Sequence, residues 1–242
     1  MTKLSVNLNK IALLRNQRDI GIPSVTEAAE IVIQSGANGI TVHPRPDERH
    51  IRYSDVYELA EMLTVEFNIE GNPFTGRYMD IVSDVKPDQA TLVPDLPDAN
   101  TSDHGWDLKA DKQSVAPIIK KLKNLGIRVS LFMNPEIDGI KMAKDIGADR
   151  VELYTEPYAR AFRTNQELEN VLDRYITAAG AASDCELGLN SGHDLNLKNL
   201  GKFCSEVSGI LEVSIGHALI ADALKMGLRD TVKAYLEVLS AV

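Results

Sequence analysis

The chain is poor in cysteine, in aromatic residues and in long apolar runs. Its two cysteines, Cys185 and Cys204, are too few for a disulfide framework, so neither points to an oxidising compartment. No stretch reaches the roughly 20 apolar residues that a membrane-spanning helix needs. The N-terminal residues MTKLSVNLNKIALLRNQR lack the apolar run and the cleavage site of a secretory signal. We therefore expect a cytoplasmic protein.

Positive charge is also in short supply. Lys and Arg number 26 against 35 Asp and Glu, which gives a formal net charge of −9. An acidic chain repels the phosphate backbone of nucleic acids and the surface of anionic membranes, so we expect neither as a partner. Small phosphorylated ligands are not excluded, because a few Arg side chains and a nest of backbone N–H groups can bind a phosphate locally.

What the sequence does contain is a regular alternation of short apolar runs and longer amphipathic runs. The short runs are rich in Val, Ile and Thr, as buried strands are, and cover residues 4–8, 39–43, 68–71, 89–93, 128–132, 150–154, 186–190 and 212–215. The longer runs predict helices at residues 24–34, 55–65, 75–85, 112–125, 135–146, 164–182, 197–204, 218–226 and 228–242. No low-complexity segment or Pro/Gly/Ser-rich linker interrupts this alternation.

Eight strands that alternate with helices favour a parallel sheet closed into a barrel. The length of 242 residues fits one such barrel, which typically takes about 250 residues. The prediction is an α/β protein with a single (β/α)8 TIM-barrel domain over residues 1–242 and extra helices. An open doubly wound sheet is the alternative, but it normally has fewer strands, and the chain contains neither GxGxxG nor GxxxxGK[ST].

Polar side chains gather at the predicted strand ends, where barrels of this kind carry their chemistry. Four of the five histidines fall at or just after such an end: His43, His50, His193 and His217. The segments 190–193 and 214–217 follow the seventh and eighth strands, and both contain a Gly-His pair. These loops often bind phosphate in barrels, although a glycine there can also serve turn geometry alone.

Three further features could serve binding or proton transfer. Residues 43–50 form a basic cluster, and Arg15 with Arg18 forms another; the alternatives are a solvated loop and a polar helix face. Glu70 stands alone in an apolar strand, where a dry environment raises a carboxyl pKa towards neutrality. Glu152 is placed similarly, and a buried ion pair is the alternative for both. His43 is the expected base, because imidazole titrates near working pH.

The sequence pattern gives less support to a metal site or to a Schiff-base lysine. The histidines are scattered over several strands, without HExxH or a Cys pair, although three of them at a barrel mouth could bind zinc. Lys10 is the candidate for a Schiff-base lysine, and it lies beyond the first strand rather than on it. From the residues alone the chain is a barrel with two or three anion sites and several acid–base groups.

Several segments resemble the pyridoxine 5'-phosphate synthase family. They are VNLNKIALLRNQR at 6–18, GITVHPRPDERHI at 39–51, and shorter stretches at 92–94, 129–132, 190–193 and 215–218. The match is collinear from about residue 4 to the C-terminus. The resemblance implies a transferase-class, ring-forming condensation of 1-deoxy-D-xylulose 5-phosphate with 3-amino-2-oxopropyl phosphate. It yields pyridoxine 5'-phosphate, phosphate and water in vitamin B6 biosynthesis, without metal or cofactor, and implies a homo-octamer.

The resemblance also implies roles for individual residues. His43 and Glu70 would be proton acceptors, His193 a proton donor, and Glu152 a group that stabilises the transition state. The residues that would hold the amino-ketone phosphate are Asn7, Arg18, His193, Gly216 and His217. The residues that would hold the deoxyxylulose phosphate are Asn9, Lys10, Arg45, His50 and Thr101.

The chain departs from the family pattern at two places. Asn9-Lys10 stand where many members have Asp-His, and Asp194 stands where Gly is usual. Asp194 would reduce phosphate affinity if its carboxylate pointed inward, and would be harmless facing a helix N-terminus. Because a fold does not determine a function, a phosphosugar epimerase or aldolase and a non-catalytic phosphate binder are the rival hypotheses.

Overall fold

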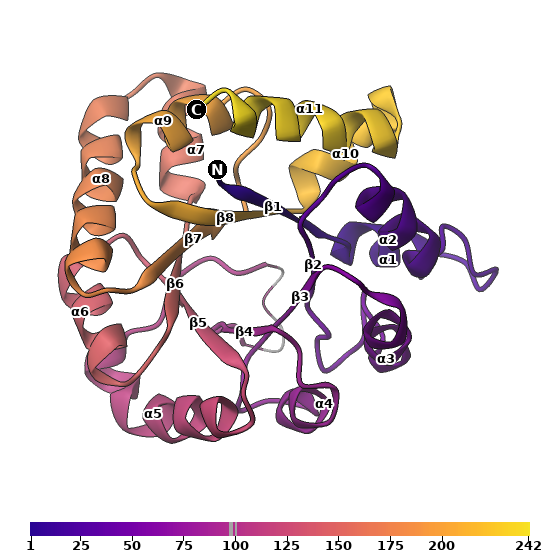
Figure 1. Ribbon diagram of the computed structural model, residues 1–242, viewed down its shortest axis with the longest axis horizontal. Coiled ribbons are helices and arrows are strands. Elements are labelled where there is room, and N and C mark those ends of the chain that lie inside the picture. The colour runs from indigo at the N-terminus through magenta and orange to yellow at the C-terminus, as the bar shows by residue number, and fades with distance from the viewer. Residues whose placement is uncertain (97–98, 100) are drawn as a thin grey trace.

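The eight strands form one closed parallel barrel in the order β1-β2-β3-β4-β5-β6-β7-β8 (Figure 1). This computed structural model describes residues 1–96, 99 and 101–242. The strands are β1 (Lys3–Asn7), β2 (Gly39–Val42), β3 (Glu66–Gly71), β4 (Gln89–Leu92), β5 (Arg128–Met133), β6 (Arg150–Leu153), β7 (Gly188–Gly192) and β8 (Ile210–Ile215). The predicted barrel is confirmed, all eight predicted strands are present, and the open-sheet alternative is wrong.

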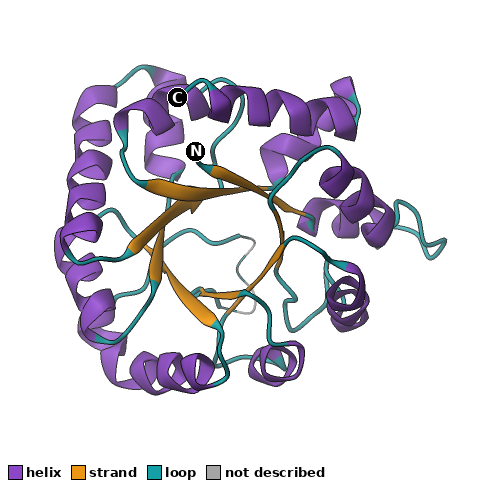
Figure 2. Ribbon diagram, viewed as in Figure 1, coloured by secondary structure: helices purple, strands orange, loops and turns teal. Residues whose placement is uncertain are grey.

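Helices surround the barrel on its outside (Figure 2). They are α1 (Asn9–Arg15), α2 (Val25–Gln34), α3 (Tyr53–Met62), α4 (Tyr78–Val85), α5 (Leu108–Asn124), α6 (Ile137–Asp145), α7 (Glu156–Thr164), α8 (Leu168–Asp184), α9 (Leu200–Glu206), α10 (His217–Met226) and α11 (Leu228–Ser240). The extra helices that were predicted are therefore present.

Two helix predictions were incomplete. The segment predicted as one helix over 164–182 is interrupted, because Asn165 and Glu167 adopt left-handed backbone angles with φ of 54° and 52°. Asn165 is the C-cap of α7, a separate helix that the pattern had not indicated. The short helix α1 was also missed, because seven residues make only about two helical turns and carry little periodic signal.

The barrel interior is polar, while the apolar residues of the strands pack outward against the helices. Ser5 and Thr41 share a hydrogen bond of 2.7 Å, and the Asn68 amide donates to the Thr41 hydroxyl at 3.3 Å. Thr91 in turn donates to the Asn68 carbonyl oxygen at 3.0 Å. The alternate apolar residues, such as Val6 and Ile40, are fully buried in the core shared with the helices. The barrel interior thus places polar groups close to the C-terminal ends of the strands.

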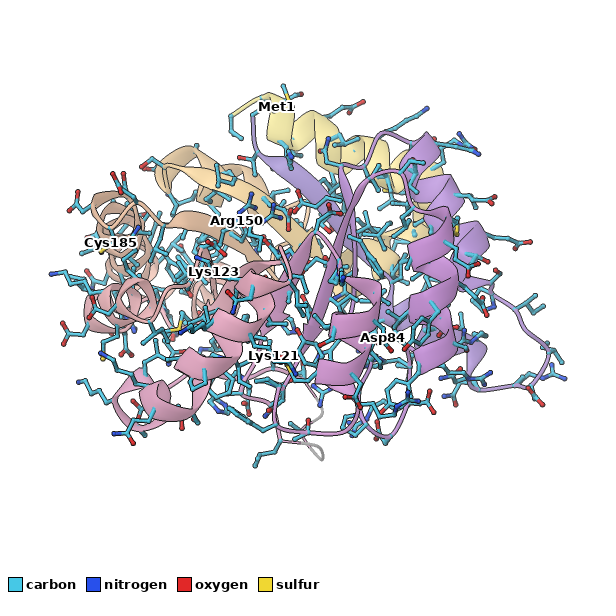
Figure 3. All side chains as sticks on the ribbon, turned by 60° about the horizontal axis from the view of Figure 1, so that its bottom comes forward. Met1, Asp84, Lys121, Lys123, Arg150 and Cys185 are labelled. Carbon is cyan, nitrogen blue, oxygen red and sulfur yellow. The ribbon has the colours of Figure 1, made fainter. Side chains whose placement is uncertain are left out.

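Charged side chains fill the opposite, N-terminal end of the bore. Arg128 forms an ion pair with Glu66, and Lys3 lies 3.7 Å from the same carboxylate. Burial, together with the neighbouring Glu66, raises the pKa of Glu212 to about 8. Figure 3 shows the side chains on the ribbon with Arg150 labelled, whose Nη1 donates to the Asn190 carbonyl oxygen at 3.0 Å. This end carries no predicted site residue.

Candidate active site

A cavity of about 520 Å³ opens at the C-terminal ends of the strands. Its lining comprises Asn7, Asn9, Lys10, His43, Arg45, His50, Glu70, Thr101, Ser102, Glu152, His193, Asp194, Asn196, Ser214, Gly216, His217 and Ala218. Every predicted catalytic and substrate-binding residue except Arg18 is among them. Residues from seven of the eight strands or the loops after them therefore meet around one space, as a barrel rim requires.

The two arginines that follow β1 are not part of the cavity lining. Arg15 is buried and donates to both carboxylate oxygens of Asp55, at 2.5 and 2.9 Å, and to the His50 carbonyl at 3.2 Å. The idea of Arg15 as a cation for a ligand is therefore wrong, because its guanidinium serves the fold. Arg18 is exposed in the segment that follows α1, and its role as a phosphate ligand stays a prediction.

Two asparagines link the ends of β1, β2 and β3. The Asn9 Oδ1 atom accepts a hydrogen bond from the His43 backbone N–H at 2.9 Å. The Asn7 Nδ2 atom donates to Glu70 Oε2 at 3.3 Å, and its Oδ1 atom accepts from the Asn9 backbone N–H. A carboxylate at position 9 could accept from the same N–H, so the departure to Asn keeps this contact.

His43 and His50 are both held neutral near pH 7. Burial, together with the nearby charges of Arg45 and Lys10, lowers the pKa of His50 to about 4. Burial also lowers the pKa of His43 well below its usual value, and Arg45 and His50 add to that effect. His50 Nδ1 accepts the Ile51 backbone N–H at 2.9 Å, so its proton lies on Nε2, which can donate to a ligand. A neutral His43 can accept a proton.

Arg45 is a buried residue rather than part of a solvated loop. Its Nη2 atom donates to Asp95 Oδ2 at 2.6 Å, and its Nη1 atom donates to the Ala99 carbonyl at 2.8 Å. Asp95 also accepts from the Ser102 hydroxyl at 2.7 Å. This ion pair fixes the guanidinium at the cavity wall, so the solvated-loop alternative is wrong for Arg45.

The two predicted carboxyl groups have strongly raised pKa values. Burial raises the pKa of Glu70 to about 7, while His193 and Arg45 oppose the shift and Asp95 adds to it. Burial, with Glu70 and Glu212 as further causes, raises the pKa of Glu152 well above its usual value. Within the described residues neither carboxyl takes part in an ion pair, and Glu152 Oε2 is buried without a hydrogen-bond partner. Glu70 can thus exchange protons near neutral pH, whereas Glu152 is a neutral acid.

His193 lies between a hydroxyl and a carboxylate. Its Nε2 atom is 2.9 Å from Thr101 Oγ1, and its Nδ1 atom is 3.0 Å from Asp194 Oδ2. Burial opposes a charge on this imidazole, but Asp194 and Glu70 outweigh it and raise the pKa of His193 above its usual value. A protonated imidazole at this position can donate a proton to a ligand.

The loop after β8 leads directly into the N-terminus of α10. A side chain at Gly216 would begin 3.1 Å from the Asn7 Cβ atom, so glycine lets the two segments approach closely. The first backbone N–H groups of α10 have no partner within the helix, which makes them donors for an anion. Gly216 and His217 can therefore bind an anion on one wall of the cavity, and Lys10, Arg45 and His50 form a second wall after the neighbouring strands β1 and β2.

The pattern of predicted site residues was incomplete. Ser102, Asn196, Ser214 and Ala218 also line the cavity, and Asp95 holds Arg45 from outside that lining. Asp95 comes directly after the Val-Pro that ends the fourth apolar run, so its position at a strand end was the signal that could have identified it. Asp194 was seen only as a departure, and the sequence did not reveal its contact with His193.

Other parts of the surface offer less chemistry. A hollow of about 670 Å³ lies between the segments that enter α5 and α6, and it contains none of the predicted site residues. In the described part of the chain, no group of three or more His, Cys, Asp or Glu side chains is arranged to hold a metal ion. Among the described helices none has the length and apolar character needed to cross a membrane.

The chain is similar to known proteins in sequence and in fold. The model of the family described as pyridoxal phosphate biosynthesis protein PdxJ matches residues 4–241. The chain is 53% identical to a pyridoxine 5'-phosphate synthase of Albidiferax ferrireducens, over 97% of this chain and 96% of that one. It is 48% identical to the protein of the same name from Porphyromonas gingivalis, over 99% and 100% of the two chains. The phosphoribosyl anthranilate isomerase of Thermotoga maritima superposes with a TM-score of 0.61 over 100% of both chains, and its 14% identity shows a likeness of fold alone.

Proposed function

The chain belongs to the PdxJ family of pyridoxal phosphate biosynthesis proteins, and we propose on that basis that it catalyses the reaction of a pyridoxine 5'-phosphate synthase. The enzyme condenses 1-deoxy-D-xylulose 5-phosphate with 3-amino-2-oxopropyl phosphate and releases pyridoxine 5'-phosphate, phosphate and water. The observation that supports this most is the cavity in which His43, Glu70 and His193 face the same space, with the pKa of His43 lowered, that of Glu70 raised to about 7 and that of His193 raised. This is a transferase-class reaction of vitamin B6 biosynthesis.

The two substrates would occupy these two walls of the cavity. Asn9, Lys10, Arg45, His50 and Thr101 hold the deoxyxylulose phosphate, since the cations and the His50 Nε2–H can bind its phosphate. Asn7, Arg18, His193, Gly216 and His217 hold the amino-ketone phosphate, whose anion faces the N-terminus of α10. Two anion-binding walls are what a reaction of two phosphorylated molecules needs.

The reaction proceeds by proton transfers that these side chains can perform. The amine of one substrate attacks the ketone of the other and a Schiff base forms with loss of one water. Phosphate then leaves, and the ring closes with loss of a second water. His43 and Glu70 accept protons, because one is neutral and the other titrates near pH 7. His193 supplies a proton to a leaving oxygen. Neutral Glu152 stabilises the transition state by donating a hydrogen bond from its buried carboxyl group.

The proposal extends to the whole molecule. Residues 1–242 act as one TIM-barrel domain, and the chains assemble into a homo-octamer in the cytoplasm, where phosphorylated intermediates are retained. Exposed apolar side chains support assembly, among them Leu14, Ile20 and Ile22 near α1 and Leu224 on α10, because contact with another copy would remove them from water. Mass photometry of the purified protein tests this: an octamer is expected, and a monomer at micromolar concentration would contradict it.

The activity is tested by mixing the purified protein with both phosphates. Pyridoxine 5'-phosphate and inorganic phosphate should appear in equal amounts, as measured by chromatography and a phosphate assay. No product under conditions in which a relative such as the Porphyromonas gingivalis synthase is active would refute the proposal. Borohydride treatment with either substrate alone provides a control, because covalent trapping on Lys10 would point instead to aldolase chemistry.

A further inference from the structure

We propose that Asp194 is a positioning residue that orients His193 and keeps it protonated, so that His193 can act as the proton donor of the reaction. The inference rests on the proposed function and assigns a role to a residue at which this chain departs from the usual glycine. Asp194 does not need to touch the substrates, because it acts through the imidazole. Asp194 in place of glycine would then change the orientation and protonation of His193 rather than weaken phosphate binding.

The contacts around His193 define one orientation of its ring. Asp194 Oδ2 lies 3.0 Å from Nδ1, and Thr101 Oγ1 lies 2.9 Å from Nε2 on the other side of the ring. Phe132 meets the imidazole edge-to-face at a centroid distance of 6.5 Å. With the carboxylate on Nδ1, a proton is held at that atom and the second proton of the cation is directed from Nε2 towards the Thr101 side of the cavity.

The backbone of Asp194 is itself fixed to the barrel. Its N–H donates to Thr155 Oγ1 at 3.1 Å, and the Thr155 hydroxyl donates to the Gly192 carbonyl at 3.1 Å. The Asn199 amide donates to the Asp194 carbonyl at 3.4 Å. The carboxylate is therefore presented to Nδ1 by a segment that is tied to β6 and α9, and it does not depend on a bound ligand for its place.

A glycine at position 194 would lack the negative charge that Asp194 places beside His193. The acidic groups that face His193 are Asp194 on its own loop, Glu70 at the end of β3 and Asp95 after β4. His43 at the end of β2 is also close enough to interact electrostatically with His193. Among the described residues, Asp194 is the one carboxylate that accepts a hydrogen bond from His193. It is also the group in direct contact, so its removal should affect the imidazole most.

Two substitutions separate the charge of Asp194 from its shape. Asp194→Asn keeps an oxygen that can accept from Nδ1 but removes the charge, and Asp194→Glu keeps the charge on a longer side chain. The control is Asp103→Asn, which removes a carboxylate from a similar pair, since Asp103 Oδ1 lies 2.5 Å from Nδ1 of the adjacent, exposed His104. Neither Asp103 nor His104 lines the cavity.

The first measurement is the titration of His193 by NMR in the free protein, with its ring signals assigned by comparison with His193→Gln. The pKa of His193 should fall in Asp194→Asn, recover at least partly in Asp194→Glu and stay unchanged in Asp103→Asn. An unchanged His193 pKa in Asp194→Asn would overturn the inference. This readout needs no turnover, so it stands apart from the test of the proposed function.

The second measurement is the dependence of kcat on pH. Activity that needs protonated His193 declines as pH rises through the pKa of that group, so Asp194→Asn should begin to lose activity at lower pH. Above the His193 pKa of the parent protein, the kcat of Asp194→Asn should be about tenfold or more below that of the parent, because an opposite charge at this range shifts a pKa by about one to three units. The KM for each phosphate should stay within about twofold. A raised KM with the same pH profile would assign Asp194 a purely structural role and overturn the inference.

Discussion

Replacing Glu70 by Gln is the sharpest test of the acid–base arrangement. The substitution removes the proton-accepting carboxylate and keeps the side-chain shape. Asn7 Nδ2 donates to Glu70 Oε2 at 3.3 Å, and the Gln carbonyl oxygen can accept the same hydrogen bond. The cations of the phosphate walls are untouched. The variant should therefore bind both phosphates nearly as well as the parent while losing most of its turnover.

The expected loss follows from the pKa of the group. Because burial raises the pKa of Glu70 to about 7, about half of the carboxyl groups are ionised at pH 7 and can accept a proton. A well-placed general base contributes about 10²- to 10⁴-fold to a rate, so kcat should fall by that factor. The limb of the parent pH profile on which activity rises through about pH 7 should vanish in the variant.

The same carboxyl should reduce the stability of the parent protein. The folded-state pKa of about 7 lies above the usual value of 4.5, so the folded protein favours the neutral carboxyl. The contribution of this carboxyl to the free energy of unfolding is therefore lost as pH rises from 4.5 through 7. The difference of about 2.5 pKa units corresponds to at most about 3 kcal/mol, less what solvent in the cavity screens. Glu70→Gln should be more stable than the parent at pH 8, and the gain should be smaller at pH 5.

The assay combines product formation, calorimetric titration with inorganic phosphate and urea unfolding at both pH values. Glu58→Gln on the exposed side of α3 is the matched control and should behave as the parent in all three. Normal turnover in Glu70→Gln would remove Glu70 from the mechanism. A loss of turnover accompanied by equal loss of phosphate binding would show that the carboxyl organises the site rather than moving protons.

Three further substitutions test other parts of the structure. Arg15→Met should lower the free energy of unfolding by about 3–5 kcal/mol, because it leaves the Asp55 carboxylate buried without its partner. Urea unfolding measures this, and a large rise in KM with unchanged stability would restore Arg15 as a ligand. Arg45→Lys should raise the KM for the deoxyxylulose phosphate about tenfold or more, because a charge-assisted hydrogen bond contributes about 1.5–3 kcal/mol and an ammonium does not reproduce the paired contacts to Asp95 and Ala99. Steady-state kinetics measure this, and an unchanged KM would argue against that phosphate position. Glu212→Gln should reduce the loss of stability that the parent shows as pH rises from about 4.5 through about 8, the range in which the buried carboxyl stays neutral only in the folded protein. Thermal unfolding at pH 5 and pH 9 compares the two proteins, and equal losses in both would contradict the assignment.

The order of apolar and amphipathic runs was enough to predict the barrel and most of its site. Parallel strands in a closed barrel bring all their C-terminal ends to one rim. A residue's position at or just after the end of a run therefore predicted that it would face the cavity. His43, Glu70 and His193 come from three distant segments, yet this rule alone brought them together. The family resemblance then assigned them roles.

Contacts between distant residues were decided only by the tertiary structure. Nothing in the sequence near Arg15 shows that Asp55, 40 residues away, binds its guanidinium. The pKa values of Glu70 and Glu152 depend on burial and on neighbours from other strands. The contact between Asp194 and His193 likewise depends on how the loop after β7 is tied to Thr155 and Asn199. A sequence pattern records which side of an element a residue lies on, whereas charge, protonation and hydrogen bonding depend on distances in space that only the packed chain sets.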